Sequence, residues 1–315
     1  MRHLDKKISS SKLGYLLIFL AGAGWGTGGV WITQMNKLGA SSLMTGFTGH
    51  LFAVPMLALA ILVTLGTKGF KISKRGLLFS IIMGVVTKGF FKMAYDTTVS
   101  TVGVSTGVVL LYTAPVFVAI LSMIVFKEKL QKNNYLALGL NLIGVFLMVT
   151  LGNFSSLNIA PLGIALGFIS AFLHASNTIM AKIAGNVDDS LTMAFYMLVF
   201  STITQGIFAQ PWTDTNMALL TSGSFLFWAL INALITGALA NLFYLKGMST
   251  SIDASKAPII SSVEVIVASL MGVIIFGEGM NWVGLLGIGL MLSSIYLMNL
   301  KPEEIIGGEL HEEVY

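Results

Sequence analysis

The sequence predicts an all-α polytopic membrane protein with ten transmembrane helices, arranged as two inverted five-helix repeats. The chain is 55% hydrophobic and only 10% charged, whereas soluble domains carry about 25% charged residues. Its mean hydropathy is +0.86, and long apolar runs recur along the chain with only short loops between them. The two halves also share residue patterns at a spacing of about 150 residues.

Ten apolar runs are long enough to cross a bilayer, which takes roughly 20 mostly apolar residues in a helix. The first run follows a basic flank, as in a signal peptide, but its length and the nine runs after it predict a true span. Transmembrane strands do not fit, because the runs are long and lack strict alternation. The expected spans are 13–35, 43–66, 77–95, 104–126, 135–151, 162–182, 191–210, 225–245, 254–276 and 282–300.

Composition also excludes several classes of protein. The chain has no cysteine, which excludes disulfides, thiolate metal sites and a cysteine nucleophile. Its net charge of +4 would suit a nucleic-acid binder, but most basic residues flank apolar runs, where they orient a chain in a membrane. We therefore expect no nucleic-acid partner. No GxxxxGK[ST] loop for ATP is present, and we expect no cofactor and no metal.

The distribution of Lys and Arg predicts the orientation, because cytoplasmic loops are enriched in these residues. One set of loops holds only Lys37. The other set, with the N-terminal tail, holds Arg2, Lys6, Lys7, Lys12, Lys68, Lys71, Lys74, Arg75, Lys127, Lys129, Lys132, Lys182, Lys246 and Lys301. Both termini are therefore expected in the cytoplasm of a cell whose plasma membrane holds the protein, and residues 301–315 form an acidic cytoplasmic tail.

The repeat is visible in two pairs of segments. "IVFKEKL" (Ile124–Leu130) matches "IIFGEGM" (Ile274–Met280), and "LGYLLIFL" (Leu13–Leu20) matches "LGIALGFI" (Leu162–Ile169). This pairs spans one to five, in 13–151, with spans six to ten, in 162–300. Five is an odd number, so the second half would insert upside down, and inverted repeats are a recurrent device of transporters.

Three segments give the chain a family resemblance: "LLYTAPVFVAILSMIVFKEKL" (110–130), "ASKAPIISSVEVIVASLMGVIIFGEG" (254–279) and "GWG" (24–26). The chain resembles the ten-helix, EamA-like branch of the drug/metabolite transporter superfamily over about residues 13–300. The resemblance implies a central cavity lined by helices one, three, four, six, eight and nine, with helices five and ten at the periphery. It also implies transport of small metabolites, more commonly by export.

The third span carries charged residues on one face. Lys88, Lys92 and Asp96 follow one another at one-turn spacing, and Phe91 and Tyr95 lie beside them. A charge near the bilayer centre costs about 2.5–3.5 kcal/mol on insertion scales, so we expect Lys88 to face a cavity inside the bundle. For Lys92 two interpretations stay open: it faces the same cavity, or it extends to the interface and pairs with Asp96.

Span nine carries Lys256 and Glu264, eight residues apart and so roughly on one side of the helix. Lys256 lies near the cytoplasmic start and either binds substrate or extends to the interface. Glu264 is central in the span. It pairs with a lysine, Lys88 being the nearest candidate, or it is held in the neutral, protonated form because an ionised carboxylate is costly to bury. We consider it for proton handling as well as for a structural pair.

Other polar and aromatic residues complete the expected site. His174 lies in the middle of span six and titrates in the range useful for proton coupling, although a hydrogen bond to a neighbouring helix is an equally available role. His50 has a weaker claim to function. An aromatic wall for a planar or apolar part of the substrate is expected from Trp25, Phe91, Tyr95 and Tyr112.

These residues predict a secondary transporter that moves a small organic metabolite by alternating access. Three lysines in the spans against Glu264 favour an amino acid or another carboxylate-bearing or zwitterionic solute. Lys88 and Lys92, with Lys256, would bind the carboxylate, and Glu264 or His174 would carry a coupling proton. The expected partners are the substrate, the lipid bilayer and protons as candidate coupling ions, and both a monomer and a homodimer stay open.

Two other classes of protein were compared with the transporter. An intramembrane enzyme would need a pattern such as His-Glu-x-x-His or Gly-x-Ser-x-Gly, and the sequence has neither. A membrane receptor or scaffold that transports nothing remains an alternative that only a functional assay separates from a transporter.

Overall fold

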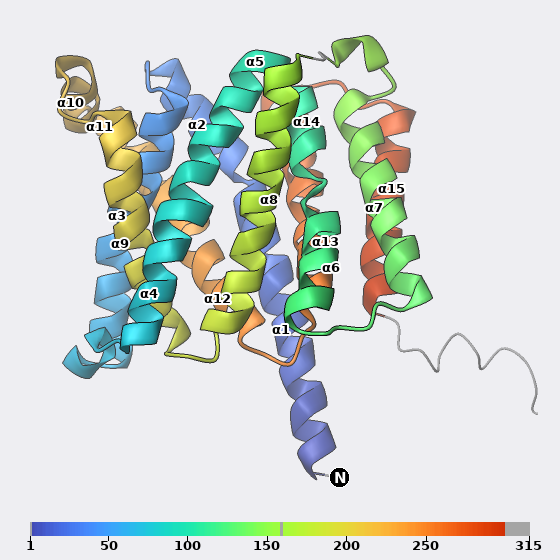
Figure 1. The fold of residues 1–315 in the computed structure, drawn as a ribbon. Coiled ribbons are helices and arrows are strands. Elements are labelled where there is room, and N and C mark those ends of the chain that lie inside the picture. The colour runs from blue at the N-terminus through green and yellow to red at the C-terminus, as the bar shows by residue number, and fades with distance from the viewer. Residues whose placement is uncertain (1, 158–159, 300–315) are drawn as a thin grey trace, which may run out of the picture.

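The computed structural model describes residues 2–157 and 160–299, and the described residues form helices and turns without a β-strand (Figure 1). The predicted acidic tail, with Lys301, lies outside them. The elements of the first half are α1 (Arg2–Gly26), α2 (Gly28–Lys37), α3 (Ser42–Thr64), η1 (Thr67–Phe70), α4 (Lys74–Ile82), η2 (Met83–Phe90), α5 (Phe91–Leu111), α6 (Ala114–Val125), α7 (Lys132–Thr150) and η3 (Phe154–Ser156).

The second half has a similar order of elements. It contains α8 (Pro161–Ala184), α9 (Ser190–Ala209), α10 (Asp214–Thr221), α11 (Gly223–Asn232), η4 (Ala233–Leu239), α12 (Ala240–Met248), η5 (Ala254–Lys256), α13 (Ala257–Ser261), α14 (Val263–Phe276) and α15 (Trp282–Asn299). The helices run roughly side by side, so the bundle has two ends (Figure 1). We call the end where α1 begins the N-side and the opposite end, where α10 lies, the far side.

Eight helical runs among the described residues are long and apolar enough to cross a membrane. They cover the expected spans one, two, three, five, six, seven, eight and nine. The two other expected spans, 104–126 and 282–300, contain the shorter apolar helices Ala114–Val125 and Trp282–Met298. The all-helical membrane fold is therefore confirmed.

The expected end of the third span at Tyr95 is wrong, because the helical run that starts at Lys74 continues well beyond it. Gly103 interrupts this run with φ +83° and ψ 165°, a conformation that glycine adopts without a Cβ clash. The chain then turns back. Gly163 of α8 lies against Thr101 and Val102 before the turn, whereas Gly167, one turn further along α8, lies against Leu110 after it.

Several irregular features recur 150 residues apart. A π-helical segment forms η2 from Met83, and another forms η4 from Ala233. Left-handed residues follow α6 and α14, at Lys127 (φ +55°) and Gly277 (φ +67°). A helix also breaks after Leu111 in the first half and after Ser261 in the second. Irregular backbone inside a membrane bundle is tolerated where it is buried in protein or lines a cavity.

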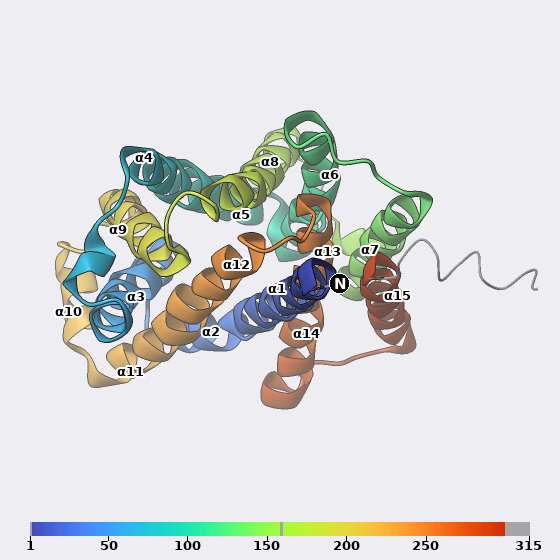
Figure 2. The same ribbon diagram turned by 90° about the horizontal axis from the view of Figure 1, so that it is seen from below.

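Helices α7 and α15 pack against each other at one edge of the bundle (Figure 2). Glycines allow this close contact: a Cβ at Gly144 would lie 2.9 Å from the carbonyl oxygen of Gly287, and a Cβ at Gly287 would lie 2.7 Å from that of Gly144. Asn141 joins this pair to the bundle, since its Nδ2 donates to Ser262 Oγ (2.7 Å) and Ser294 Oγ (3.3 Å). Small residues and buried amides are common in such membrane contacts.

This contact predicts that Gly287→Val lowers stability, because the added side chain forces α7 and α15 apart at a cost of about 1–3 kcal/mol. The measurement is the melting temperature of the purified protein in detergent. Gly289→Val is the matched control, since a Cβ at Gly289 on the same helix meets nothing within 4 Å. Equal melting temperatures for the two variants would contradict the close contact.

Candidate functional site

A cavity of about 830 Å³ lies in the middle of the bundle, between the two halves. Its wall includes Asp96 on α5, Val104 after the break at Gly103, and Glu278 just after the end of α14. Both α5 and α14 reach the far side (Figure 1). Of the described residues, none from the N-side loops at 65–73, 126–131, 185–189 and 249–253 lines it. The cavity therefore opens toward the far side and is closed toward the N-side.

Lys88 lies on η2 and faces the indole ring of Trp25 on α1, with Nζ 5.1 Å from the ring centroid. A desolvated ammonium gains about 2 kcal/mol from such a contact. The ring itself is held in place, because Trp25 Nε1 donates to the carbonyl oxygen of Thr236 on η4 (3.2 Å). The two π-helical segments thus define opposite sides of the same part of the cavity.

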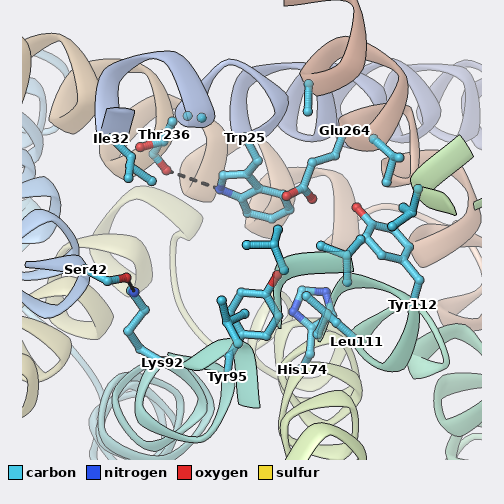
Figure 3. A pocket seen from close by; sticks show the side chains of 18 of the residues that line it. Trp25, Ile32, Ser42, Lys92, Tyr95, Leu111, Tyr112, His174, Thr236 and Glu264 are labelled. Atoms are coloured by element: carbon cyan, nitrogen blue, oxygen red, sulfur yellow. Dashed lines mark hydrogen bonds between the residues drawn. The ribbon is translucent and has the colours of Figure 1, made fainter. Parts of the chain in front are cut away.

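Glu264 on α14 points toward Tyr112 and lies near Trp25 (Figure 3). The Tyr112 hydroxyl faces the Glu264 carboxylate, and Lys88 is close enough for its charge and that of Glu264 to attract each other. The described residues contain two salt bridges, Lys92–Asp96 and Lys256–Asp253. Lys88 and Glu264 therefore line one cavity without the direct ion pair that was one expectation for Glu264.

The aromatic side chains expected in the site lie together. Phe91 stacks on Tyr95 with ring centroids 5.9 Å apart, and its other neighbour is His174, at 5.4 Å. Trp25 packs against Tyr244 at 5.2 Å. Because all but Tyr244 also line the cavity, they form an apolar wall around the two charged groups.

Lys92 combines both roles that the sequence left open. Its Nζ lies 2.5 Å and 2.6 Å from the two carboxylate oxygens of Asp96 and 2.6 Å from Ser42 Oγ. All three residues line the cavity, and Figure 3 shows Lys92 reaching Ser42, the first residue of α3. The Lys92 ammonium is therefore neutralised by Asp96 while it borders the entrance.

The structure brings together eight of the nine predicted site residues, namely Trp25, Lys88, Phe91, Lys92, Tyr95, Tyr112, His174 and Glu264. Lys256 lies elsewhere: its Nζ is 3.2 Å from Asp253 Oδ2 and 3.4 Å from the Tyr15 hydroxyl, on the closed N-side. Its ammonium is therefore bound near the start of the helix and does not reach the cavity.

The charge count based on three lysines and one glutamate needs correction. Lys256 is absent from the lining, while Asp96 and Glu278 are part of it. The described lining thus carries two lysines and three carboxylates. With Lys92 and Asp96 paired and Glu278 at the entrance, Lys88 and Glu264 are the opposite charges left at the deep end.

Sequence reasoning missed a polar cluster on α3 and α9. His50 Nδ1 lies 2.8 Å from Ser201 Oγ and 3.0 Å from Gln205 Nε2, and both His50 and Gln205 line the cavity. Gln205 is 2% exposed. A buried amide in an apolar run was the available signal, but spans two and seven were not among the helices that the family resemblance implied for the cavity lining.

The fold and the cavity define a class of protein: a multi-pass helical membrane protein with a polar, ligand-sized cavity between two halves. Small-molecule sites typically occupy about 300–1,000 Å³ and combine apolar walls with a few placed polar groups, and this cavity matches both features.

Comparison with known proteins identifies the family. The model of the EamA-like transporter family matches twice, at residues 12–150 and 161–300, so the chain belongs to this family. It is a membrane transporter and not an enzyme. Similar proteins include the uncharacterized inner membrane transporter YicL of Salmonella typhimurium, 27% identical, with 93% of this chain and 97% of the relative covered.

Two further relatives carry the same description. An uncharacterized transporter of Archaeoglobus fulgidus is 27% identical, with 69% of this chain and 75% of the relative covered. The uncharacterized transporter YwfM of Bacillus subtilis is 25% identical, with 71% and 74% covered. A solved crystal structure superposes with a TM-score of 0.74 at 12% identity, covering 93% of this chain and 98% of that chain, which supports the fold.

Proposed function

We propose that this transporter moves a small zwitterionic metabolite, such as an amino acid, by alternating access. The observation that carries the proposal is the pair of opposite charges in one cavity: Lys88 over Trp25, and Glu264 beside Tyr112. A substrate carboxylate would bind Lys88, and a substrate ammonium would bind Glu264. A substrate with only a negative charge would be repelled by Glu264, and one with only a positive charge would be repelled by Lys88. Either repulsion would weaken binding.

The aromatic wall supports a side chain on this substrate. Phe91, Tyr95 and Tyr112 line the same cavity as Lys88 and Glu264. Aromatic rings of this kind pack well against apolar or planar groups. His50 and Gln205, held together with Ser201, supply further donors and acceptors to the cavity wall.

We further propose ten crossings in two inverted halves. Val104–Leu111 and α6 together would form the fourth crossing, and α15 the tenth. Support comes from the two matches to one family model and from the features that recur 150 residues apart. The opposite starting ends of α1 and α8 also support it (Figure 1). Inverted halves allow two related arrangements, each open to one side.

The basic residues of the N-side loops support a cytoplasmic N-side with both termini there. The cavity would then open to the outside in this conformation. Export is proposed as the direction, as the family resemblance implies, with Glu264 or His174 carrying a coupling proton. Monomer and homodimer are both compatible with this proposal.

Purified protein in liposomes tests the function. A thermal-shift screen of zwitterionic, anionic and cationic metabolites first identifies binders, because a ligand that binds the folded state raises the melting temperature. We expect zwitterions to bind and to drive counterflow of a labelled substrate. Binding without counterflow would favour a receptor, and binding confined to simple cations or anions would contradict the zwitterion assignment.

A further inference from the structure

The N-side closure includes a carboxylate that joins the two halves. Glu128 follows α6, and its Oε1 and Oε2 accept hydrogen bonds from the amides of Ala254 (2.7 Å) and Ser255 (3.2 Å). These amides begin the helical run of η5 and α13, where N–H groups lack helical partners and favour negative charge. Ala254 and Ser255 are 0% and 2% exposed.

The far side has an equivalent glutamate and an equivalent pair of backbone amides, but the two are not in contact there. Glu278 lies 150 residues after Glu128, and each of the two follows a left-handed residue. The backbone amide of Glu128 donates to Ser122 O (3.4 Å), and that of Glu278 donates in the same way to Gly272 O (3.2 Å). Val104 and Ser105 lie 150 residues before Ala254 and Ser255.

Those two far-side residues also begin a helical run, because Gly103 interrupts the helix before them. Val104 is 65% exposed, Ser105 is half-buried and Glu278 is exposed. All three line the cavity. The far side therefore presents an acceptor and two helix-starting amides on opposite edges of the opening.

The glutamate and the amides on each side belong to, or directly follow, the same two chain segments. Segment 104–125 and segment 254–276 run in opposite directions, so the end of each lies on the same side of the bundle as the start of the other. On the N-side Glu128 joins them. On the far side the cavity separates them. Two antiparallel segments of this kind can close at one end as they open at the other, by a hinge motion of each segment.

We propose that Glu128 and Glu278 are alternating latches: the cavity closes toward the far side when Glu278 binds the amides of Val104 and Ser105, and Glu128 then releases those of Ala254 and Ser255. This inference rests on the proposed alternating access. Each latch is a charge-assisted pair of hydrogen bonds, and each stabilises one conformation without contacting the deep end of the cavity.

Cross-linking tests the geometry and leaves both glutamates in place. The chain has no cysteine, so pairs can be introduced without background. Lys129→Cys with Ser255→Cys reports the N-side latch, and Gly279→Cys with Ser105→Cys is the equivalent far-side pair. With a short bifunctional thiol reagent, the first pair should cross-link in the resting protein. The second should cross-link faster when substrate is present, and each cross-link should stop counterflow until reduced.

Labelling of single cysteines tests the two glutamates. Val99→Cys reports the open cavity wall, and Ala257→Cys, at a fully buried position near the N-side, reports the closed end. Glu128→Gln should raise labelling at 257 and lower it at 99, each about tenfold, since a charged hydrogen-bond pair is lost. Glu278→Gln should leave labelling at 99 high, lower labelling at 257 and slow counterflow.

The control is Asp253→Asn, next to Ala254 but bound to Lys256, which should leave both labelling rates unchanged. Wild-type labelling and counterflow in Glu278→Gln would overturn the proposal, as would a far-side pair that never cross-links during transport. If Glu128→Gln fails to fold, the Glu278→Gln variant and the two cross-linking pairs still test the latch proposal. Cysteine labelling reports the conformation of the protein and does not require transport. A wild-type protein without counterflow would therefore contradict the proposed function, while the labelling rates would still test the latches.

Discussion

Replacing Lys88 with alanine is expected to abolish measurable transport of a zwitterionic substrate while the protein still folds. The ammonium lies over Trp25 in the deep part of the cavity and has no salt-bridge partner among the described residues. Losing the partner of a buried substrate carboxylate costs about 2–5 kcal/mol, which weakens binding about 30-fold or more. Counterflow and substrate-dependent thermal shift measure the loss.

Lys256→Ala is the matched control for this variant. Lys256 is also a lysine of a helical span, but it contacts Asp253 and Tyr15 at the closed end, outside the cavity lining. Its replacement should leave substrate affinity close to that of the wild type. Equal affinity in the wild type and Lys88→Ala would remove Lys88 from the site.

The second large effect is expected for Glu264→Gln. Glutamine keeps the size of the side chain and its contact with Tyr112 but cannot gain and release a proton. Because the amide still accepts a hydrogen bond from the substrate ammonium, exchange of substrate for substrate should survive at saturating substrate, with a raised KM. If Glu264 also carries the coupling proton, accumulation driven by a pH gradient should disappear even at saturating substrate. Proteoliposomes with and without an imposed gradient separate these two activities.

Asp253→Asn provides the control for the loss of a carboxylate, because Asp253 lies on the N-side. It should keep gradient-driven accumulation. Accumulation that survives in Glu264→Gln would end the coupling role of Glu264 and direct attention to His174, which lines the same cavity. Loss of exchange at saturating substrate as well as of accumulation would show that the charge of the carboxylate is indispensable for binding the substrate ammonium.

Much of the fold could be predicted because lipid imposes a simple length rule on apolar runs. Residues such as Lys88 and Glu264 could be assigned to a cavity because charge in hydrocarbon is costly. The end of the third helix could not be located, since residues after Tyr95 stay helical and only the backbone of Gly103 interrupts them. The pairing of Lys92 with Asp96, and the place of Lys256, depend on side-chain direction, which spacing alone does not determine.

The carbonyl oxygen of Thr236 has a consequence for the tuning of specificity. It accepts from Trp25 Nε1 (3.2 Å) and Asn241 Nδ2 (3.0 Å) because the π-helical winding of η4 leaves it outside the usual helical ladder. Shortening Ala233–Leu239 by one residue would restore ordinary winding and withdraw this anchor. The indole beneath Lys88 would then lose its hydrogen bond and be free to turn, so the backbone winding of η4 controls the position of a side chain on another helix.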